Sequence, residues 1–479
     1  MRFILGLYIF FFAAIVASAP YPTVLPPSVD PFYDIPDELE SKNPGDILKF
    51  RKSPHRIRSI FLPVDVKNAW QMMVRSTDSH GNATAIVTTL IEPFNSNSSR
   101  LLQYQIAEDS GSVDCSASYS FLFGASPDTL AAQAEMYFIQ IALNEGWWVN
   151  VPDYEGPKAA FTAGRQAGHA VLDTLRGVLK NTNDTGLNPE PEVVMWGYSG
   201  GSLATGWAAA LQPLYAPDLS PRIIGAALGG FASNITTTII AIDGGFYTGL
   251  VATGVTGLSN EYPQLKPIIQ REVPEKFKWI YDKAGKTCLL PSILYGMYAQ
   301  VFRGSNRWIQ AGYSLLSEPV VADVLHNVTL GISKEDFPEI PIFIYHGMKD
   351  NIVPYINTER IYDTWCSWGI KSLEVAASEN TRHVTEMVGG APAAFAWVSK
   401  RFNGESTVDG CSLTKRSTNL QYPGVSMAIV ETLQAAAKSI LQFKIGPSSP
   451  TLDKRGLIDY DMIVEAQLAE SYKKRTLRY

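Results

Sequence analysis

The chain has 479 residues, of which 46% are apolar and 18% are charged, and its formal net charge at pH 7 is −6. This length and apolar content suit one large domain with an insertion, or two domains, around a substantial buried core. Acidic and basic residues are interspersed along the chain, so we expect no basic surface for nucleic acid and no nucleic-acid partner.

The N-terminus has the pattern of a secretory signal peptide at residues 1–19. Arg2 supplies the positive charge, residues 3–16 form the apolar core, and small residues at 17–19 suit a cleavage site. The core is too short to span a membrane comfortably, although an anchor helix is the alternative. No later stretch reaches the apolar length of a spanning helix, so we expect a soluble mature protein without a membrane span. We expect it to be secreted, extracellular and monomeric.

The segments after the signal peptide predict an α/β fold. Residues 20–45 are rich in proline and acidic residues and indicate an extended arm. Residues 57–90 alternate between apolar and polar positions, as antiparallel strands at the edge of a sheet do. Short apolar runs then alternate with stretches of helical spacing, at 101–107, 129–144, 147–151 and 163–180. This alternation indicates a mainly parallel sheet with helices on both faces.

The motif Gly-x-Ser-x-Gly occupies residues 197–201, after an apolar run and before a helix-compatible segment at 203–211. A buried strand that turns sharply into a helix has this pattern, and the turn holds its serine in a strained backbone conformation. The free N–H groups at the start of the helix favour developing negative charge. We therefore expect Ser199 to be a nucleophile, whereas an ordinary glycine-rich turn is the alternative.

The alternation of strands and helices is interrupted after a further predicted strand at 222–230. The next segment is rich in Gly, Thr and aromatic residues, and we interpret it as a cap inserted over the serine. An apolar run at 340–347 resumes the alternation, and residues 372–376 suit a last strand. The predicted division is a signal peptide at 1–19, two parts of the core at 20–231 and 323–445, the cap at 232–322, and a C-terminal tail at 446–479.

A nucleophilic serine needs a base to take its proton and an acid to orient that base. Where the serine lies between a strand and a helix, the acid follows it in the chain and the histidine comes last. Asp350 comes directly after the predicted strand at 340–347, where the active sites of open parallel sheets gather. His383 is the only one of the six histidines further along the chain. We therefore predict Asp350 as the acid and His383 as the base.

Other residues could take these places. Asp323 and Asp363 are rival acids, and Asp350 could instead hydrogen-bond its own backbone in a turn, as aspartate often does. His383 could be a surface residue at the start of a helix. His346 comes before the acid in the chain, so we expect a structural role for it at the end of a strand.

The negatively charged oxygen that forms when an ester is attacked needs two backbone N–H donors. We expect Gly200, the residue after the serine, to provide one of them. The second should come from an earlier turn at the end of a strand, and the turn at 152–156 follows the apolar run at 147–151. Position alone indicates this second donor, and a plain turn is the alternative.

The cysteine content agrees with export into an oxidising compartment. Four cysteines allow three pairings, of which Cys115–Cys288 with Cys366–Cys411 is the least entangled, and buried free thiols are the alternative. Five Asn-x-Ser/Thr triplets are predicted glycosylation sites, at Asn82, Asn97, Asn183, Asn234 and Asn327.

Taken together, these residues resemble the fungal secretory lipase family, the secreted lipases of Candida-type yeasts and their lipase A relatives. The similarity runs from about residue 30 to about 445 and is carried by segments at 152–156, 197–207, 350–354 and 382–386. It implies an α/β-hydrolase core with an inserted helical cap, and it supports the cysteine pairing given above. The site it implies has Ser199 as nucleophile, Asp350 as acid, His383 as base, and an oxyanion hole made by the backbone N–H groups of Asp153 and Gly200.

The same resemblance implies hydrolysis of triacylglycerols and other carboxylic esters at a lipid–water interface, without a metal or an organic cofactor. Some members of the family transfer acyl groups to alcohols. Apolar residues at 239–251 could open toward that interface or could form the core of the cap. The alternatives are a carboxylesterase for smaller soluble esters, a serine peptidase, and a catalytically inactive binding protein with the same fold.

Overall fold

The structure is a computed structural model that describes residues 24–433, except 61 and 432. The predicted signal peptide at 1–19 and the predicted tail at 446–479 lie outside the described residues. No helix in the described part of the chain has both the length and the apolar character that crossing a membrane requires.

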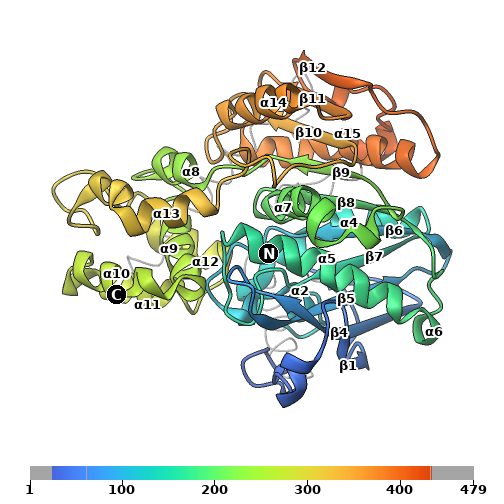
Figure 1. Ribbon diagram of the computed structural model, residues 1–479, viewed down its shortest axis with the longest axis horizontal. Coiled ribbons are helices and arrows are strands. Elements are labelled where there is room, and N and C mark those ends of the chain that lie inside the picture. Colours follow the sequence, from blue (N-terminus) through green and yellow to red (C-terminus); the bar gives the residue numbers. More distant parts are fainter. Residues whose placement is uncertain (1–23, 61, 432, 434–479) are drawn as a thin grey trace, which may run out of the picture.

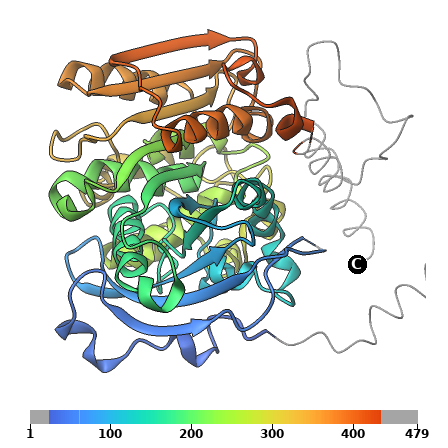
Figure 2. The same ribbon diagram turned by 90° about the vertical axis from the view of Figure 1, so that its right-hand side faces the viewer.

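A ten-stranded sheet forms the centre of the described chain, in the order β1-β4-β5-β7-β6-β8-β9-β10-β11-β12 (Figure 1). Pairs from β1 to β7 in this order are antiparallel, and pairs from β7 to β12 are parallel. Figure 2 shows the blue N-terminal strands at one edge and the red β12 at the other. The prediction of a mainly parallel sheet with helices around it is confirmed.

The strands of this sheet are β1 (Ile47–Lys52), β4 (Asn68–Thr77), β5 (Ala83–Glu92), β6 (Asn97–Gln105), β7 (Trp147–Pro152), β8 (Glu192–Tyr198), β9 (Ile223–Gly229), β10 (Ile342–Gly347), β11 (Ser372–Ser378) and β12 (Gly410–Arg416). A separate two-stranded sheet pairs β2 (Arg58–Ser59) with β3 (Leu62–Pro63).

Helices cover both faces of the sheet. On one face, α5 (Gly164–Lys180) packs against α7 (Gly200–Tyr215). On the other face, α15 (His383–Phe402) packs against β9 and β10, and α4 (Met136–Asn144) packs against β7. The other helices of the core are α2 (Ala117–Ser120), α3 (Leu130–Ala134), α6 (Thr182–Thr185) and α14 (Ile356–Trp368).

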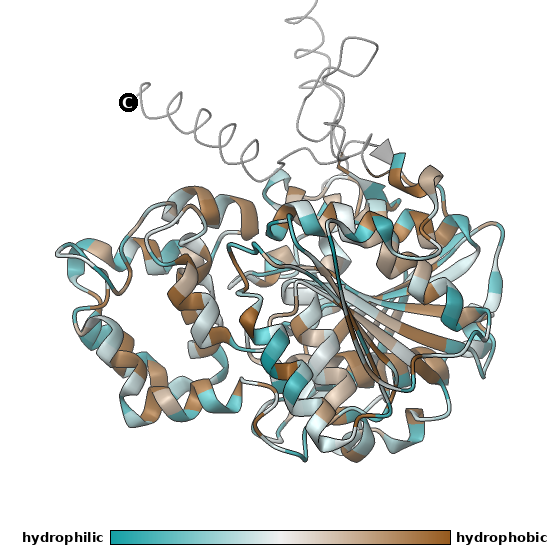
Figure 3. Cartoon of the chain, turned by 90° about the horizontal axis from the view of Figure 1, so that it is seen from above, coloured by the Kyte–Doolittle hydropathy of each residue, from teal (hydrophilic) through white to brown (hydrophobic). Residues whose placement is uncertain are grey.

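Strand β8 shows why both faces need cover. Side chains of a strand alternate between its faces, so Val193 and Met195 join the core beneath α5 and α7. Val194 and Trp196 join the core beneath α4 and α15. Each of these four side chains is at most 1% exposed, and burying one contributes roughly 1.5–3 kcal/mol. Apolar stretches accordingly run along strands in the middle of the sheet (Figure 3), and the serine turn directly follows β8.

The helices between β9 and β10 gather to one side of the sheet (Figure 1). They are α8 (Ile235–Ile242), α9 (Gly249–Glu261), α10 (Lys266–Glu272), α11 (Lys278–Ala284), α12 (Leu289–Gly296) and α13 (Pro319–Asn327). The predicted cap at 232–322 covers most of this region, and its boundaries stay a prediction.

The apolar segment at 239–251 lies mainly inside this group of helices. Ile240 is 46% exposed. Its other large apolar side chains are at most 6% exposed, except Leu250, which is half-buried; the buried ones are Ile239, Ile242, Phe246, Tyr247 and Val251. The structure therefore favours the alternative in which this segment forms the core of the cap.

Two disulfides join segments that lie far apart in the chain. Cys115–Cys288 connects the loop after β6 to the start of α12. Cys366–Cys411 connects α14 to β12. Both predicted pairings are confirmed, and the first one ties the cap to a loop of the core.

Candidate active site

Ser199 lies in the turn between β8 and α7 with φ 54° and ψ −121°. A residue other than glycine is strained at positive φ, so the surrounding structure must hold this turn. The Ser199 N–H donates to the Gly229 carbonyl of β9 at 2.9 Å. A Cβ at Gly197 would overlap the Gly201 carbonyl, and a Cβ at Gly201 would overlap the Gln105 carbonyl. The two glycines of the motif are therefore required by close backbone approach.

His383 is the first residue of α15, and its side chain reaches the serine. Its Nε2 atom lies 2.8 Å from Ser199 Oγ. The Tyr198 hydroxyl donates to the His383 carbonyl oxygen at 2.6 Å, which fixes the backbone of the histidine beside the serine turn. The histidine is buried, so it is a part of the site and not the surface residue of the alternative.

Asp350 lies in the turn after β10, and its Oδ2 atom is 2.6 Å from His383 Nδ1. The other carboxylate oxygen accepts the N–H groups of Ile352 at 2.8 Å and Val353 at 2.7 Å. Burial by itself raises the pKa of Asp350, but the charge of His383 and hydrogen bonds from His346 and His383 outweigh it and bring the pKa well below its usual value. Asp350 is therefore a carboxylate that orients His383.

A second histidine contacts the same carboxylate. His346 Nε2 lies 3.2 Å from Asp350 Oδ2 and 3.0 Å from the Val353 carbonyl oxygen. His346 Nδ1 accepts the Phe231 N–H at 3.3 Å and lies 2.7 Å from Thr358 Oγ1. Because Nδ1 accepts an N–H and Nε2 faces two acceptor oxygens, the ring proton is on Nε2. His346 therefore donates toward Asp350. The sequence indicated a structural histidine here, but the contact with the acid was missed, although four positions separate the two.

The predicted second oxyanion donor is wrong. The Asp153 N–H donates to the Val87 carbonyl at 2.9 Å, so it belongs to the pairing of β7 with β5. The Asp153 carboxyl accepts the N–H and the hydroxyl of Ser118, at 2.8 Å and 2.5 Å. Gly200, the first predicted donor, is the first residue of α7. The residue beside it is Asp109, since a Cβ at Gly200 would overlap Asp109 Oδ1.

Asp109 belongs to a group of buried carboxyls beside the serine turn, in the loop after β6. Its backbone has φ 47°, and its Oδ1 atom has no hydrogen-bond partner among the described residues. Burial raises the pKa of Asp109 to about 7, against the effect of the charge of His383. Burial also raises the pKa of Glu108 and Glu155, and like charges add to it. The sequence analysis missed this group, because only the position of Glu108 and Asp109 after an apolar run could have indicated it.

The predicted glycosylation sites lie at the surface with one exception. Asn82, Asn97, Asn183 and Asn327 are exposed. Asn234 is half-buried, and its side chain accepts the Thr237 N–H at 3.1 Å at the start of α8. Glycosylation of all five stays a prediction. Among the described residues, no group of His, Cys, Asp and Glu side chains has an arrangement that could hold a metal ion.

A mainly parallel sheet with helices on both faces, and a serine at a strand–helix turn that contacts a histidine and an aspartate, define an α/β-hydrolase. Residues 122–410 match the family described as secretory lipase. Lipase 1 of Candida albicans is 46% identical over 437 residues, which cover 91% of this chain and 93% of that protein. Lipase 4 of the same organism is 43% identical, with 93% and 96% covered.

A solved structure agrees with these relatives. The X-ray structure of Candida antarctica lipase A in its closed state is 27% identical to this chain, with a TM-score of 0.74, and 86% of this chain and 96% of that chain are covered. The chain belongs to the secretory lipase family, and it is an ester hydrolase of the lipase class.

Proposed function

We propose that this protein is a secreted, extracellular serine lipase that hydrolyses triacylglycerols at a lipid–water interface. The observation that carries the proposal is the pair of hydrogen bonds from Ser199 through His383 to Asp350, 2.8 Å and 2.6 Å long. The family and the relatives that carry the name lipase support the substrate class. The signal-peptide pattern at 1–19 supports the location.

In the proposed first step, His383 Nε2 takes the Ser199 proton while Oγ attacks the ester carbonyl carbon. Asp350 stays ionised and stabilises the imidazolium through Nδ1. His383 then gives the proton to the departing alcohol oxygen, and an acyl-enzyme remains on Ser199. Water repeats the sequence and releases the fatty acid, whereas an alcohol in place of water would give acyl transfer.

The developing oxyanion would lie beside the start of α7. We propose the Gly200 N–H as the first donor. We propose Asp109 as the second donor, in place of the predicted Asp153. Two observations support Asp109: its carboxyl lies against Gly200, and burial favours the neutral form, which can donate a hydrogen bond. Loss of one such donor costs roughly 3 kcal/mol of transition-state stabilisation.

Ser199→Ala tests the proposal directly. The variant should hydrolyse an emulsified long-chain triacylglycerol at close to the background rate, with an unchanged melting temperature and circular dichroism spectrum. A phosphonate that labels active serines should label the unmutated protein and not the variant. Undiminished hydrolysis by the variant would refute the serine mechanism, and absence of labelling of the unmutated protein would indicate an inactive binding protein.

A carboxylesterase for smaller soluble esters is the second candidate, because the segment at 239–251 is mostly buried and offers little apolar surface to an interface. Glycerol esters of increasing chain length, measured with and without an emulsion, separate the two activities. A lipase should gain rate when the long-chain substrate forms an interface. A preference for short esters in solution would favour the carboxylesterase.

A further inference from the structure

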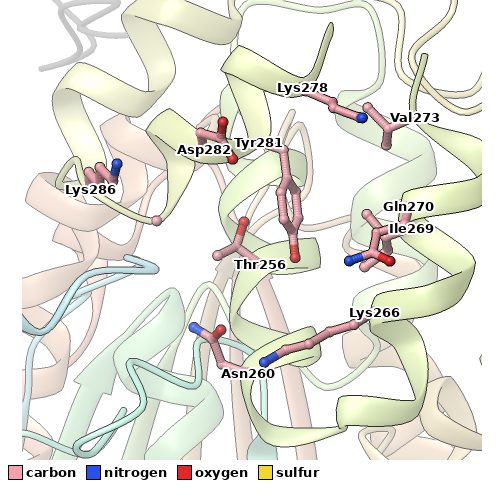
Figure 4. Close-up of a pocket in the computed structure, with 11 residues that line it drawn as sticks. Thr256, Asn260, Lys266, Ile269, Gln270, Val273, Lys278, Tyr281, Asp282 and Lys286 are labelled. Carbon is pink, nitrogen blue, oxygen red and sulfur yellow. The ribbon is translucent and has the colours of Figure 1, made fainter. Parts of the chain in front are cut away.

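A cavity of about 590 Å³ lies within the cap, between α9, α10 and α11 (Figure 4). Its volume falls within the range of roughly 300–1,000 Å³ that small-molecule sites occupy. None of its lining residues belongs to the arrangement of Ser199, His383 and Asp350. The proposed reaction mechanism therefore leaves this cavity without a role.

The cavity has an apolar wall. Ile269 and Val273 line it from α10 and the residue that follows, and the ring of Tyr281 stands between them and α9 (Figure 4). The Tyr281 hydroxyl is 2.5 Å from Ser259 Oγ, so its polar atom has a partner within the cap. The ring itself is left to contact a ligand, and the wall suits a hydrocarbon chain.

The rim of the cavity is cationic. Lys266, Lys278 and Lys286 line different sides of it, against a single carboxylate, Asp282 (Figure 4). Lys278 forms an ion pair with Glu275. Within the described residues, the ammonium groups of Lys266 and Lys286 form no hydrogen bond or ion pair. Lys266 lies one turn before Ile269 on α10, and a cation beside an apolar wall favours a ligand with an anionic head and an apolar chain.

The inner end of the cavity packs on the loop that passes the serine turn. A Cβ at Gly111 would lie 2.9 Å from Thr256 Cγ2, and Thr256 lines the cavity. The Ser110 hydroxyl donates to the Thr287 carbonyl at 3.2 Å. Ser110 and Gly111 follow Asp109 directly in the chain. A ligand in the cavity would therefore contact a wall that is continuous with the active-site loop.

We propose that this cavity binds a free fatty acid, with the carboxylate at Lys266 and the chain along Ile269, Val273 and Tyr281. The choice of ligand rests on the proposed function, because a fatty acid is the product that lipase action would release next to the cap. The cavity would then hold the product at a place separate from the serine.

Calorimetric titration of the Ser199→Ala protein with laurate below its micelle concentration tests this proposal. Dodecanol has the same chain without the charge, and acetate has the charge without the chain, so both should bind much more weakly than laurate. Lys266→Ala should weaken laurate binding by up to about fivefold, because one exposed charge contact of up to ~1 kcal/mol is lost. Val273→Trp, which fills the cavity at unchanged charge, should weaken it as well.

The matched control is Lys276→Ala, which removes the same charge from a cap residue that does not line the cavity. It should leave laurate binding unchanged, and melting temperatures should show that each variant folds. Equal laurate binding by all variants would overturn the proposal, as would equal loss in the control. Lysine-dependent sedimentation with phosphatidylglycerol vesicles without laurate binding would also overturn it, in favour of a lipid surface.

Binding is measured on a protein that cannot turn over ester, so it does not depend on the catalytic result. If the unmutated protein lacked lipase activity, laurate binding would still test the cavity. If laurate failed to bind, triacylglycerol hydrolysis by the unmutated protein would still stand.

Discussion

Asp350 Oδ2 lies 3.2 Å from His346 Nε2, in addition to its 2.6 Å contact with His383 Nδ1. His346 is fully buried, and its own ring is held by Thr358 through Nδ1. The carboxylate that orients the proposed catalytic base is thus itself oriented by a second imidazole from the preceding strand. His346 is a positioning residue, because it acts through Asp350.

Substitution of His346 should therefore impair turnover. His346→Ala removes a donor to a buried carboxylate, which is typically worth ~1.5–3 kcal/mol, so we expect kcat to fall by about tenfold or more with little change in KM. His346→Gln, which keeps an N–H donor, should recover part of the activity. Thr358→Val is the control, because it removes a partner of the ring and leaves the contact with Asp350. Equal kcat losses in the Ala and Gln variants would indicate a purely structural role.

The buried carboxyls should make the fold less stable as the pH rises. Burial raises the pKa of Asp109 and Asp153 from 3.8 to about 7, and that of Glu135 from 4.5 to about 8. Between these values the folded state binds more protons than the unfolded state, so the free energy of unfolding decreases with pH. We expect the melting temperature to fall between about pH 4 and about pH 8.

Asp109→Asn provides the control for this pH dependence, because the amide has nearly the same shape and does not titrate. Its melting temperature should fall less steeply over the same interval, since one of the contributing groups is gone. A slope identical to that of the unmutated protein would show that Asp109 does not titrate as the structure indicates.

Two glycines should respond in opposite ways to substitution by alanine. Gly201→Ala brings a Cβ against the Gln105 carbonyl, so we expect a loss of about 1–3 kcal/mol in the free energy of unfolding, and loss of activity. Gly389 lies within α15, and a Cβ there would have no neighbour within 4 Å. Gly389→Ala should therefore stabilise the protein by up to ~1 kcal/mol. Urea denaturation of both variants measures the difference.

The two disulfides should contribute unequally to stability. Cys115–Cys288 closes a loop with a sequence separation of 173, and Cys366–Cys411 one of 45. Chain entropy predicts that replacing Cys115 and Cys288 by alanine lowers the free energy of unfolding by about 1 kcal/mol more than replacing Cys366 and Cys411 does. Denaturant titration of the two double variants checks the order. The reverse order would show that strain or residual structure in the unfolded chain outweighs loop length.

Much of the site was predictable from sequence because its signals are local. Ser199 was predicted from the spacing of Gly197 and Gly201 between an apolar run and a helix. Both glycines are needed because other backbone atoms approach them closely. Asp350 follows a strong buried strand, and chain order leaves His383 as the only base. The edge strands β1 and β12 were missed, because they are half-exposed and carry no clear alternation of apolar and polar residues.

Tertiary structure alone decided which groups lie beside the serine turn. The turn at Asp153 has a suitable local pattern, but its N–H pairs with Val87, which lies on a strand far away in the chain. Asp109, which we propose in its place, lies in the loop after β6, and this loop folds back against Gly200. Whether an N–H is available, or a carboxyl is buried and neutral, depends on neighbours that are distant in sequence. A local motif specifies the bend of its own backbone, and only the packed fold supplies those neighbours.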